Sequence, residues 1–182
     1  QGFSAKPFSP QTYIDCSGNF NNGGCAGGWA SNAFQYSETY GIDTLESYQY
    51  AGIQNSHCFT NGRTYISKRT YPVPSGSNSM LAQSIRNKNI VAAAVDLSWK
   101  NSQFYAGGVF SGPCQTTVSE NVMVVGFGTD PRTGKQFWKL VTTMGAFWGD
   151  RGVMYIEKFN IDNDLVYSSC GLNLYANFPV FK

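Results

Sequence analysis

The spacing of the apolar residues changes part way along the chain, and this change sets the fold class. Trp29, Ala33, Tyr36 and Tyr40 recur at helical spacing, and Gly41 stands where the C-terminal cap of a helix belongs. From Ile90 onward, short apolar runs bounded by turn residues instead predict strands over 90–97, 122–127, 136–142 and 153–158. Helices followed by antiparallel strands are typical of an α+β chain with two subdomains.

Turn-forming residues place the boundaries between these elements. Pro72 and Pro74, followed by Ser-Gly-Ser, mark a crossing, so we predict a helical subdomain over 1–73 and a β subdomain over 74–182. The Pro-Arg-Thr-Gly sequence at 131–134 predicts a hairpin turn between the second and third strands. Because the first 25 residues are rich in Pro, Gly and Asn, we expect them to form a loop.

A second helix is expected just after the crossing. Asn78 or Ser79 is suited to be its N-cap, and the apolar positions after it predict that Met80, Leu81 and Ile85 are buried.

Composition excludes several classes of protein. Hydrophobic residues make up 42% of the chain, which is enough to form a core and argues against disorder. The net charge is only +2 and the basic residues are scattered, so we expect no nucleic-acid partner. The apolar run 90–95 is far shorter than the ~20 residues of a membrane span, so none is predicted. Charged residues amount to 13%, and a surface poor in charge repels itself weakly, which favours dense assembly or storage.

The cysteines favour disulfides over a metal site. The chain has five cysteines, no C-x-x-C pair, and His57 as its one histidine, so a Cys/His zinc site lacks ligands and we expect no metal and no cofactor. An extracellular disulfide framework fits better. Because five is odd, one sulfur is either a free thiol or bonded to something outside this sequence.

Several motifs follow one another in an order that resembles a known family. Residues 9–17, with the sequence SPQTYIDCS, resemble the S-x-Q-x-x-x-D-C stretch of papain-like cysteine peptidases of the cathepsin L type. Residues 24–29, GCAGGW, resemble the G-C-x-G-G segment of that family, and the later matches keep the family order: 41–50, 104–110, 124–128, 137–138, 148–153 and 170–172. The resemblance implies a papain-like fold with a helical left half and an antiparallel, β-barrel-like right half, incomplete at its N-terminus.

The resemblance also locates the catalytic positions, and the residues there differ from the family pattern. A Cys thiolate attacks the substrate in that family, a His activates the thiol, and an Asn holds the imidazole. The Cys motif would lie before Gln1. The triplet that should carry the His reads Glu120-Asn121-Val122, and Thr142 and Met144 stand where the Asn and its shielding Trp belong. Because a carboxamide does not accept a proton near neutral pH, these changes predict a lost mechanism.

The same resemblance implies which residues line the substrate cleft. Trp29 and Ala30 should flank its main specificity pocket, and Tyr175 should lie at the floor, where the ring would fill much of the volume. Tyr175 pointing outward is the alternative. The other residues implied for the cleft are Gly27 and Gly28, which leave room for an extended peptide, and Trp148.

The resemblance assigns a partner to each cysteine. It implies disulfides Cys16–Cys58 and Cys114–Cys170, and it pairs Cys25 with a cysteine upstream of Gln1. We therefore expect a second polypeptide, or a cleaved N-terminal chain, to pack near Cys25.

The sequence thus predicts a papain-like pseudo-peptidase without hydrolytic activity. It would be secreted, or held in a lysosome-like or storage compartment, and serve a structural, storage or binding role with another chain, with peptide in a partly blocked cleft as a further partner. One alternative is an active papain-like cysteine endopeptidase whose catalytic Cys lies on a separate N-terminal segment. Another is a toxin or recognition subunit on a peptidase scaffold, although we expect its aromatic residues to be core rather than a sugar-stacking surface: Phe104, Tyr105, Trp138 and Trp148.

Overall fold

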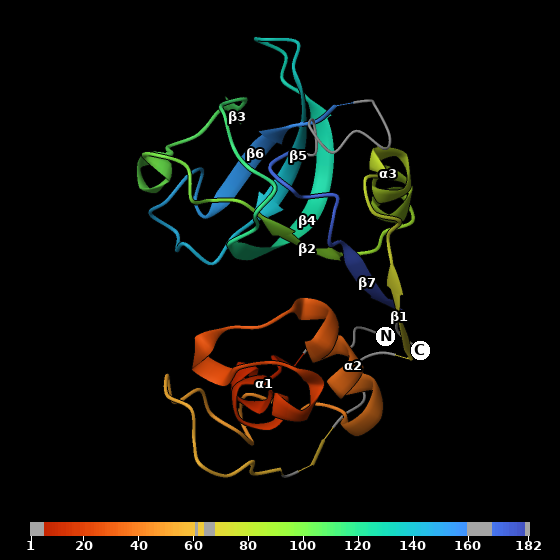
Figure 1. The fold of residues 1–182 in the computed structure, drawn as a ribbon, viewed down its shortest axis with the longest axis vertical. Coiled ribbons are helices and arrows are strands. Elements are labelled where there is room, and N and C mark those ends of the chain that lie inside the picture. Colours follow the sequence, from red (N-terminus) through yellow and green to blue (C-terminus); the bar gives the residue numbers. More distant parts are fainter. Residues whose placement is uncertain (1–5, 61, 64–67, 160–168, 181–182) are drawn as a thin grey trace. The chain divides into compact units, whose positions relative to one another are not determined.

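Helices fill the first part of the chain and strands most of the rest, which confirms the predicted α+β class (Figure 1). The computed structural model describes residues 6–60, 62–63, 68–159 and 169–180. They form two compact units: unit 1 comprises Gln1–Thr70 with Pro179–Lys182, and unit 2 comprises Tyr71–Phe178. The boundary predicted from the sequence lies between residues 73 and 74.

Unit 1 begins with a helix where a loop was expected. Helix α1 covers Pro10–Cys16, and the 3-10 turns η1 and η2 cover Gly18–Phe20 and Gly24–Ala26. The loop prediction was wrong because Ser9 is an N-cap, its hydroxyl accepting from the Gln11 N–H at 3.1 Å. Pro10 then occupies the first helical turn, where a missing N–H does no harm.

Helix α2, Ala30–Tyr40, follows the predicted apolar spacing. Gly41 caps it with φ 76°, a conformation that favours glycine, and its N–H donates to the Ser37 carbonyl at 2.9 Å. The buried Tyr36 of α2 packs edge-on against Tyr13 and Phe20, so α2 is held by aromatic contacts with the segment that precedes it.

The carboxylate of Asp15 ties α1 to the segment 48–55. It accepts hydrogen bonds from the Tyr48 hydroxyl, the Gln11 side-chain amide at 3.0 Å, and both the backbone and the side-chain amide of Asn55 at 2.8 Å. Burial alone would raise the pKa of Asp15, but these hydrogen bonds outweigh it and hold the pKa below its ordinary value. The carboxylate is thus stabilised in its charged form.

A seven-stranded sheet has the order β1-β7-β2-β4-β5-β6-β3 among the described residues. The pairs β2–β4, β2–β7, β4–β5 and β5–β6 are antiparallel, and β3 lies parallel to β6 at one edge. The strands cover Arg69–Pro72 (β1), Val91–Val95 (β2), Val109–Phe110 (β3), Glu120–Thr129 (β4), Gln136–Val141 (β5), Val153–Glu157 (β6) and Asn177–Val180 (β7).

The core of unit 2 lies on one face of strands β2, β4, β5 and β6. Alternate residues point into it, which gives burial of Val122 and Val124 on β4 and of Trp138 and Leu140 on β5. Leu81 of helix α3, which covers Asn78–Arg86, joins the same cluster.

Helix α3 covers Asn78–Arg86, and its N-cap is Ser77, so the predicted cap at Asn78 or Ser79 was wrong. The Ser77 hydroxyl accepts from the Met80 N–H at 3.3 Å. Leu81 is buried and Ile85 packs against the core as predicted, but Met80 is 42% exposed because it lies on the outer side of the helix. A short 3-10 turn, η3, covers Ser102–Phe104.

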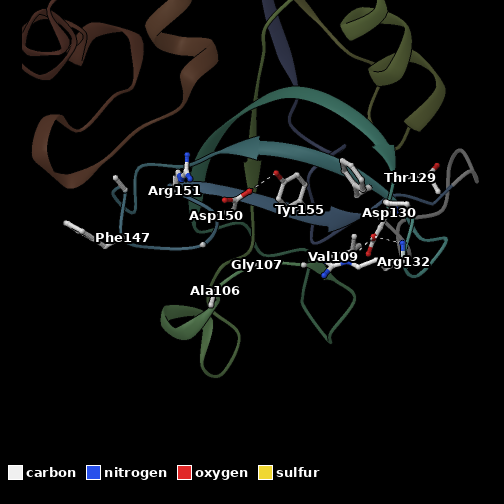
Figure 2. Close-up of a pocket in the computed structure, with 15 residues that line it drawn as sticks. Ala106, Gly107, Val109, Thr129, Asp130, Arg132, Phe147, Asp150, Arg151 and Tyr155 are labelled. Atoms are coloured by element: carbon white, nitrogen blue, oxygen red, sulfur yellow. Dashed lines mark hydrogen bonds and ion pairs between the residues drawn. The ribbon is translucent and has the colours of Figure 1, made fainter.

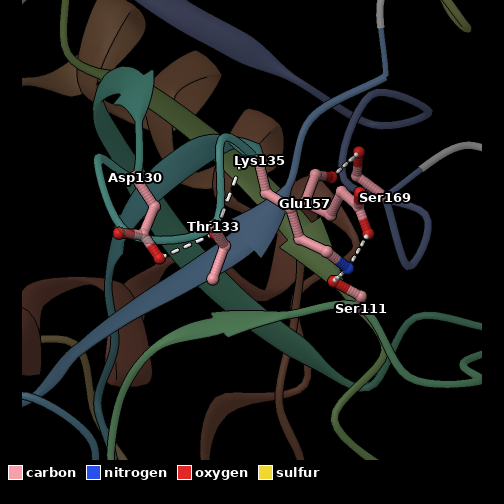
Figure 3. A network of polar contacts seen from close by, with 6 residues as sticks. All are labelled: Ser111, Asp130, Thr133, Lys135, Glu157 and Ser169. Atoms are coloured by element: carbon pink, nitrogen blue, oxygen red, sulfur yellow. Dashed lines mark hydrogen bonds and ion pairs between the residues drawn. The ribbon is translucent and has the colours of Figure 1, made fainter.

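The predicted hairpin turn connects β4 to β5. Asp130 organises it, because its carboxylate accepts from the Arg132 N–H at 3.0 Å and from the Thr133 hydroxyl at 2.8 Å. Figure 3 shows this turn beside Lys135, whose ammonium donates to the Ser111 hydroxyl at 2.6 Å and pairs with Glu157 at 3.3 Å. These contacts fix the hairpin against β6 and the loop after β3.

Candidate functional site

The candidate catalytic positions gather at one end of the β4–β5 ladder in unit 2. Glu120, Asn121 and Val122 begin β4, where they pair with β2, Asn121 lying opposite Ala94. At this end of the ladder between β4 and β5, Met123 pairs with Val141. The β4 triplet and the residue after Val141 are therefore close to one another.

Strand alternation separates the side chains of the triplet. Val122 is buried among the core residues, whereas the Asn121 side chain lies on the opposite, exposed face of β4. The residue at the position expected for the family histidine is thus accessible, but it presents an amide that does not titrate near neutral pH.

Thr142 forms hydrogen bonds to the backbone of the loop before β6. Its hydroxyl donates to the Gly152 carbonyl at 3.0 Å, and its backbone N–H donates to the same oxygen at 3.0 Å. The hydroxyl also accepts from the Met144 N–H at 3.4 Å. Met144 itself is exposed and offers a thioether, so neither residue supplies a proton acceptor at this end of the sheet.

His57, the one histidine of the chain, belongs to unit 1. It is exposed, and its Nδ1 lies 2.9 Å from the Ser56 hydroxyl. This contact is that of a surface loop residue.

The glycine-rich segment before α2 is built around Asn22. The Asn22 side-chain oxygen accepts from the Trp29 N–H at 2.9 Å, and a Cβ at Gly28 would overlap that oxygen. Gly27 and Gly28 are exposed, Trp29 is 42% exposed, and Ala30 is the first residue of α2. A larger residue at 28 would therefore displace the Asn22 side chain and its hydrogen bond to Trp29.

Tyr175 and Trp148 belong to unit 2 and differ in burial. Tyr175 is 48% exposed. Trp148 is buried in the unit 2 core, where its indole N–H donates to the Ser102 carbonyl at 2.9 Å. Of the aromatic residues expected in the core, Trp138 is fully buried, but Phe104 is 73% exposed, so that expectation was wrong for Phe104.

The disulfides are those that the resemblance implies. Cys16 is bonded to Cys58 and Cys114 to Cys170, one bridge in each unit. Cys25 is a free, exposed thiol in the turn η2.

Sequence reasoning passed over a group of charged residues around β6: Arg132, Asp150 and Arg151. They lie in the hairpin turn and in the loop before β6. No regular spacing of apolar residues in these loops distinguishes them from ordinary solvated residues.

Among the described residues, no cluster of three His, Cys, Asp or Glu side chains could hold a metal ion. None of the helices in this part of the chain combines the length and hydropathy of a membrane span.

A helical unit followed by a sheet-based unit is the arrangement that the resemblance to papain-like peptidases implies. The sequence model of papain family cysteine proteases matches residues 3–180, so the chain belongs to this family.

Individual relatives agree with this assignment. Cathepsin L1 of Drosophila melanogaster is 34% identical over 176 residues, which cover 94% of this chain and 46% of the relative. Mouse cathepsin S is 31% identical, covering 94% of this chain and 49% of the relative. The chain thus spans about half the length of these relatives.

Solved structures show the same fold. The proform of the ragweed pollen allergen Amb a 11, a cysteine protease, matches with a TM-score of 0.85 and 28% identity, covering 97% of this chain and 53% of that structure. Digestive procathepsin L 3 of Tenebrio molitor matches with a TM-score of 0.84 and 29% identity, covering 97% and 56%.

Proposed function

We propose that this chain is a papain-family homologue without hydrolytic activity, which serves a structural, storage or binding role together with another chain. The observation that carries the proposal is Asn121 at the start of β4, where the resemblance expects the histidine that activates the thiol. An amide cannot take the proton of a thiol or return one to a leaving amine.

The size of the expected effect supports an inactive chain. Loss of one member of a catalytic unit costs on the order of 10⁶ in rate, as in subtilisin. That factor corresponds to roughly 8 kcal/mol of activation free energy. Thr142 adds to the loss, because its hydroxyl is engaged with the Gly152 carbonyl and does not orient a base.

The relatives named above are called cathepsins or cysteine proteases, and this favours a second candidate function, an active cysteine endopeptidase. Such an enzyme would need a base other than Asn121. The two candidates therefore differ in one property, the proton acceptor at the end of β4.

A partner chain is proposed near Cys25. Its thiol is exposed, while the other four cysteines are paired within their own units. We propose a disulfide from Cys25 to a second polypeptide or a cleaved N-terminal chain. The two internal disulfides favour an oxidising compartment, so we place the protein outside the cell or in a lysosome-like or storage compartment.

The test is a peptidase assay on the natural full-length protein with fluorogenic peptides across acid and neutral pH. We expect no turnover above that of a sample treated with a thiol-alkylating reagent. Peptide mass spectrometry of the segment containing residue 121 is the companion measurement. Turnover that the thiol reagent abolishes would establish the enzyme instead.

A further inference from the structure

A groove on the outer face of the unit 2 sheet is a candidate binding site whose lining does not include the candidate catalytic positions. It encloses about 700 Å³, a size that suits a ligand of several residues. None of the residues 120–122, 142 or 144 lines it.

Aromatic rings form the floor of the groove. Tyr155 of β6 and Phe137 of β5 point away from the core and contact each other edge-to-face, with 5.1 Å between ring centroids. Phe147, in the loop before β6, is fully exposed at the rim. The half-buried rings of Tyr155 and Phe137, with the exposed ring of Phe147, offer a surface for an apolar or aromatic group.

Positive charge lies toward both ends of the groove. Figure 2 shows Arg151 and Phe147 toward one end, Asp130 and Arg132 at the other, and Tyr155 between them. The Arg151 side chain makes no ion pair or hydrogen bond within the part of the chain that the structure describes. Arg132 is 83% exposed, and its Nε lies 3.7 Å from Asp130, a long and weak contact.

The acidic side chains, in contrast, already have partners. Asp130 accepts from the Arg132 N–H and the Thr133 hydroxyl. Asp150 accepts from the Tyr155 hydroxyl at 3.0 Å. The two carboxylates therefore already have donors within the protein, whereas Arg151 has no acceptor there and Arg132 has only a distant one, so a ligand carboxylate can pair with either guanidinium group.

The wall formed by Gly107 and Gly108 offers backbone donors. Both residues are exposed, and in the described chain neither N–H donates a hydrogen bond. The wall leads directly into β3, the edge strand of the sheet. The edge of a sheet can bind an extended backbone, and here the carbonyls of that backbone could accept from the N–H groups of Gly107 and Gly108.

We propose that this groove binds an extended peptide segment that carries an aromatic residue between two acidic residues. The aromatic side chain packs on Tyr155 and Phe137, and the carboxylates pair with Arg132 and Arg151. The inference goes beyond the proposed function, because binding here does not depend on whether the protein cleaves peptide bonds.

The probe is a fluorescein-labelled, end-blocked peptide, Glu-Gly-Phe-Gly-Glu, titrated with the natural full-length protein and followed by fluorescence anisotropy. Two control peptides replace both Glu by Lys or the Phe by Ala. We expect the Glu/Phe peptide to bind most tightly and its affinity to fall as NaCl is raised. Hydrogen exchange should slow at the N–H groups of 107 and 108 when the peptide is bound.

Single substitutions test whether the peptide binds in this groove. Arg132→Gln and Arg151→Gln should each weaken binding about tenfold, the loss of one charge-assisted contact. Lys100→Gln removes an exposed charge of unit 2 outside the groove and should leave binding unchanged. Circular dichroism checks that each variant is folded.

Four outcomes would overturn the inference. The first three are no binding of the Glu/Phe peptide, equal binding of the Lys peptide, and undiminished binding by both arginine variants. The fourth is that maltopentaose, tested as a sugar ligand for the same aromatic rings, binds and the acidic peptide does not. Mass spectrometry of the recovered peptide separates this test from the proposed function. Cleavage of the peptide would contradict the inactive assignment and leave the groove assignment standing.

Discussion

The Thr142 hydroxyl donates to the Gly152 carbonyl at 3.0 Å, and so holds the end of β5 to the residue that precedes β6. The resemblance expects an asparagine at 142 that orients an imidazole. In this chain the side chain at 142 instead forms a hydrogen bond to the backbone.

This bond predicts that a histidine at 121 does not suffice for activity. In the natural full-length protein we expect Asn121→His alone to give only very slow turnover, because its imidazole has no orienting partner. Loss of the orienting residue of a triad costs about 10⁴ in kcat. Adding Thr142→Asn should therefore raise any turnover by a factor on the order of 10²–10⁴ over the single variant, measured with a fluorogenic peptide. Thr143→Asn is the matched control, and equal gain from it would contradict the role assigned to 142.

Asp15 predicts an acid-sensitive contribution to stability. Its pKa is lowered in the folded state, so its stabilising effect is present above the ordinary value of 3.8 and is lost as pH falls through the folded pKa. At neutral pH we expect Asp15→Asn to lower the free energy of unfolding by about 1–3 kcal/mol, since hydrogen bonds to a charged group are lost. Below pH 3.8 the difference from the wild type should shrink.

Urea unfolding between pH 7 and pH 2.5 measures both effects. Glu46→Gln, at an exposed carboxylate of the same unit, serves as the control and should change stability little. A constant deficit for Asp15→Asn across this range would argue against the hydrogen-bonded carboxylate as its source.

Adjacent residues of α3 should respond differently to truncation. Leu81 is completely buried, so Leu81→Ala should lower the free energy of unfolding by about 2–5 kcal/mol. Met80 lies on the exposed side, and Met80→Ala should change it by less than about 1 kcal/mol. Denaturant titrations compare the two, and equal losses would contradict the helix register.

Each disulfide should stabilise its unit by a similar amount. The cysteines are 42 residues apart in Cys16–Cys58 and 56 apart in Cys114–Cys170. Chain-entropy estimates give about 4 kcal/mol for loops of these lengths. The paired variants Cys16→Ala/Cys58→Ala and Cys114→Ala/Cys170→Ala should thus be destabilised alike in urea titrations. A near-zero effect of either pair would show that the chain-entropy estimate fails for that loop.

The proposed partner at Cys25 predicts a mixed disulfide. On a non-reducing gel, the natural protein should migrate as a larger species that reductant converts to smaller chains. Cys25→Ser should remove the larger species while both internal disulfides remain detectable by peptide mapping. A single species with an alkylatable Cys25 would contradict the covalent link.

Local sequence signals and the order of the family motifs account for most of what could be predicted from the sequence. Gly41 as a helix cap, the Pro131–Gly134 hairpin and the two disulfide pairs all depend on local signals or family spacing. Helix α1 was missed because Pro10 is common both in turns and at the first turn of a helix, and only the Ser9 cap distinguishes the two.

Exposure and the groove were harder to predict. Phe104 looks like a core residue by type, yet it lies in the turn η3 with its ring in solvent. Arg132 and Arg151 come from separate loops, and only the folding of β4, β5 and β6 into one sheet makes them line the same groove. No short-range pattern encodes that proximity.

One disulfide closes within each unit, and neither described bridge joins the two. A reducing agent should therefore be able to break the disulfide of one unit while the disulfide of the other unit stays intact.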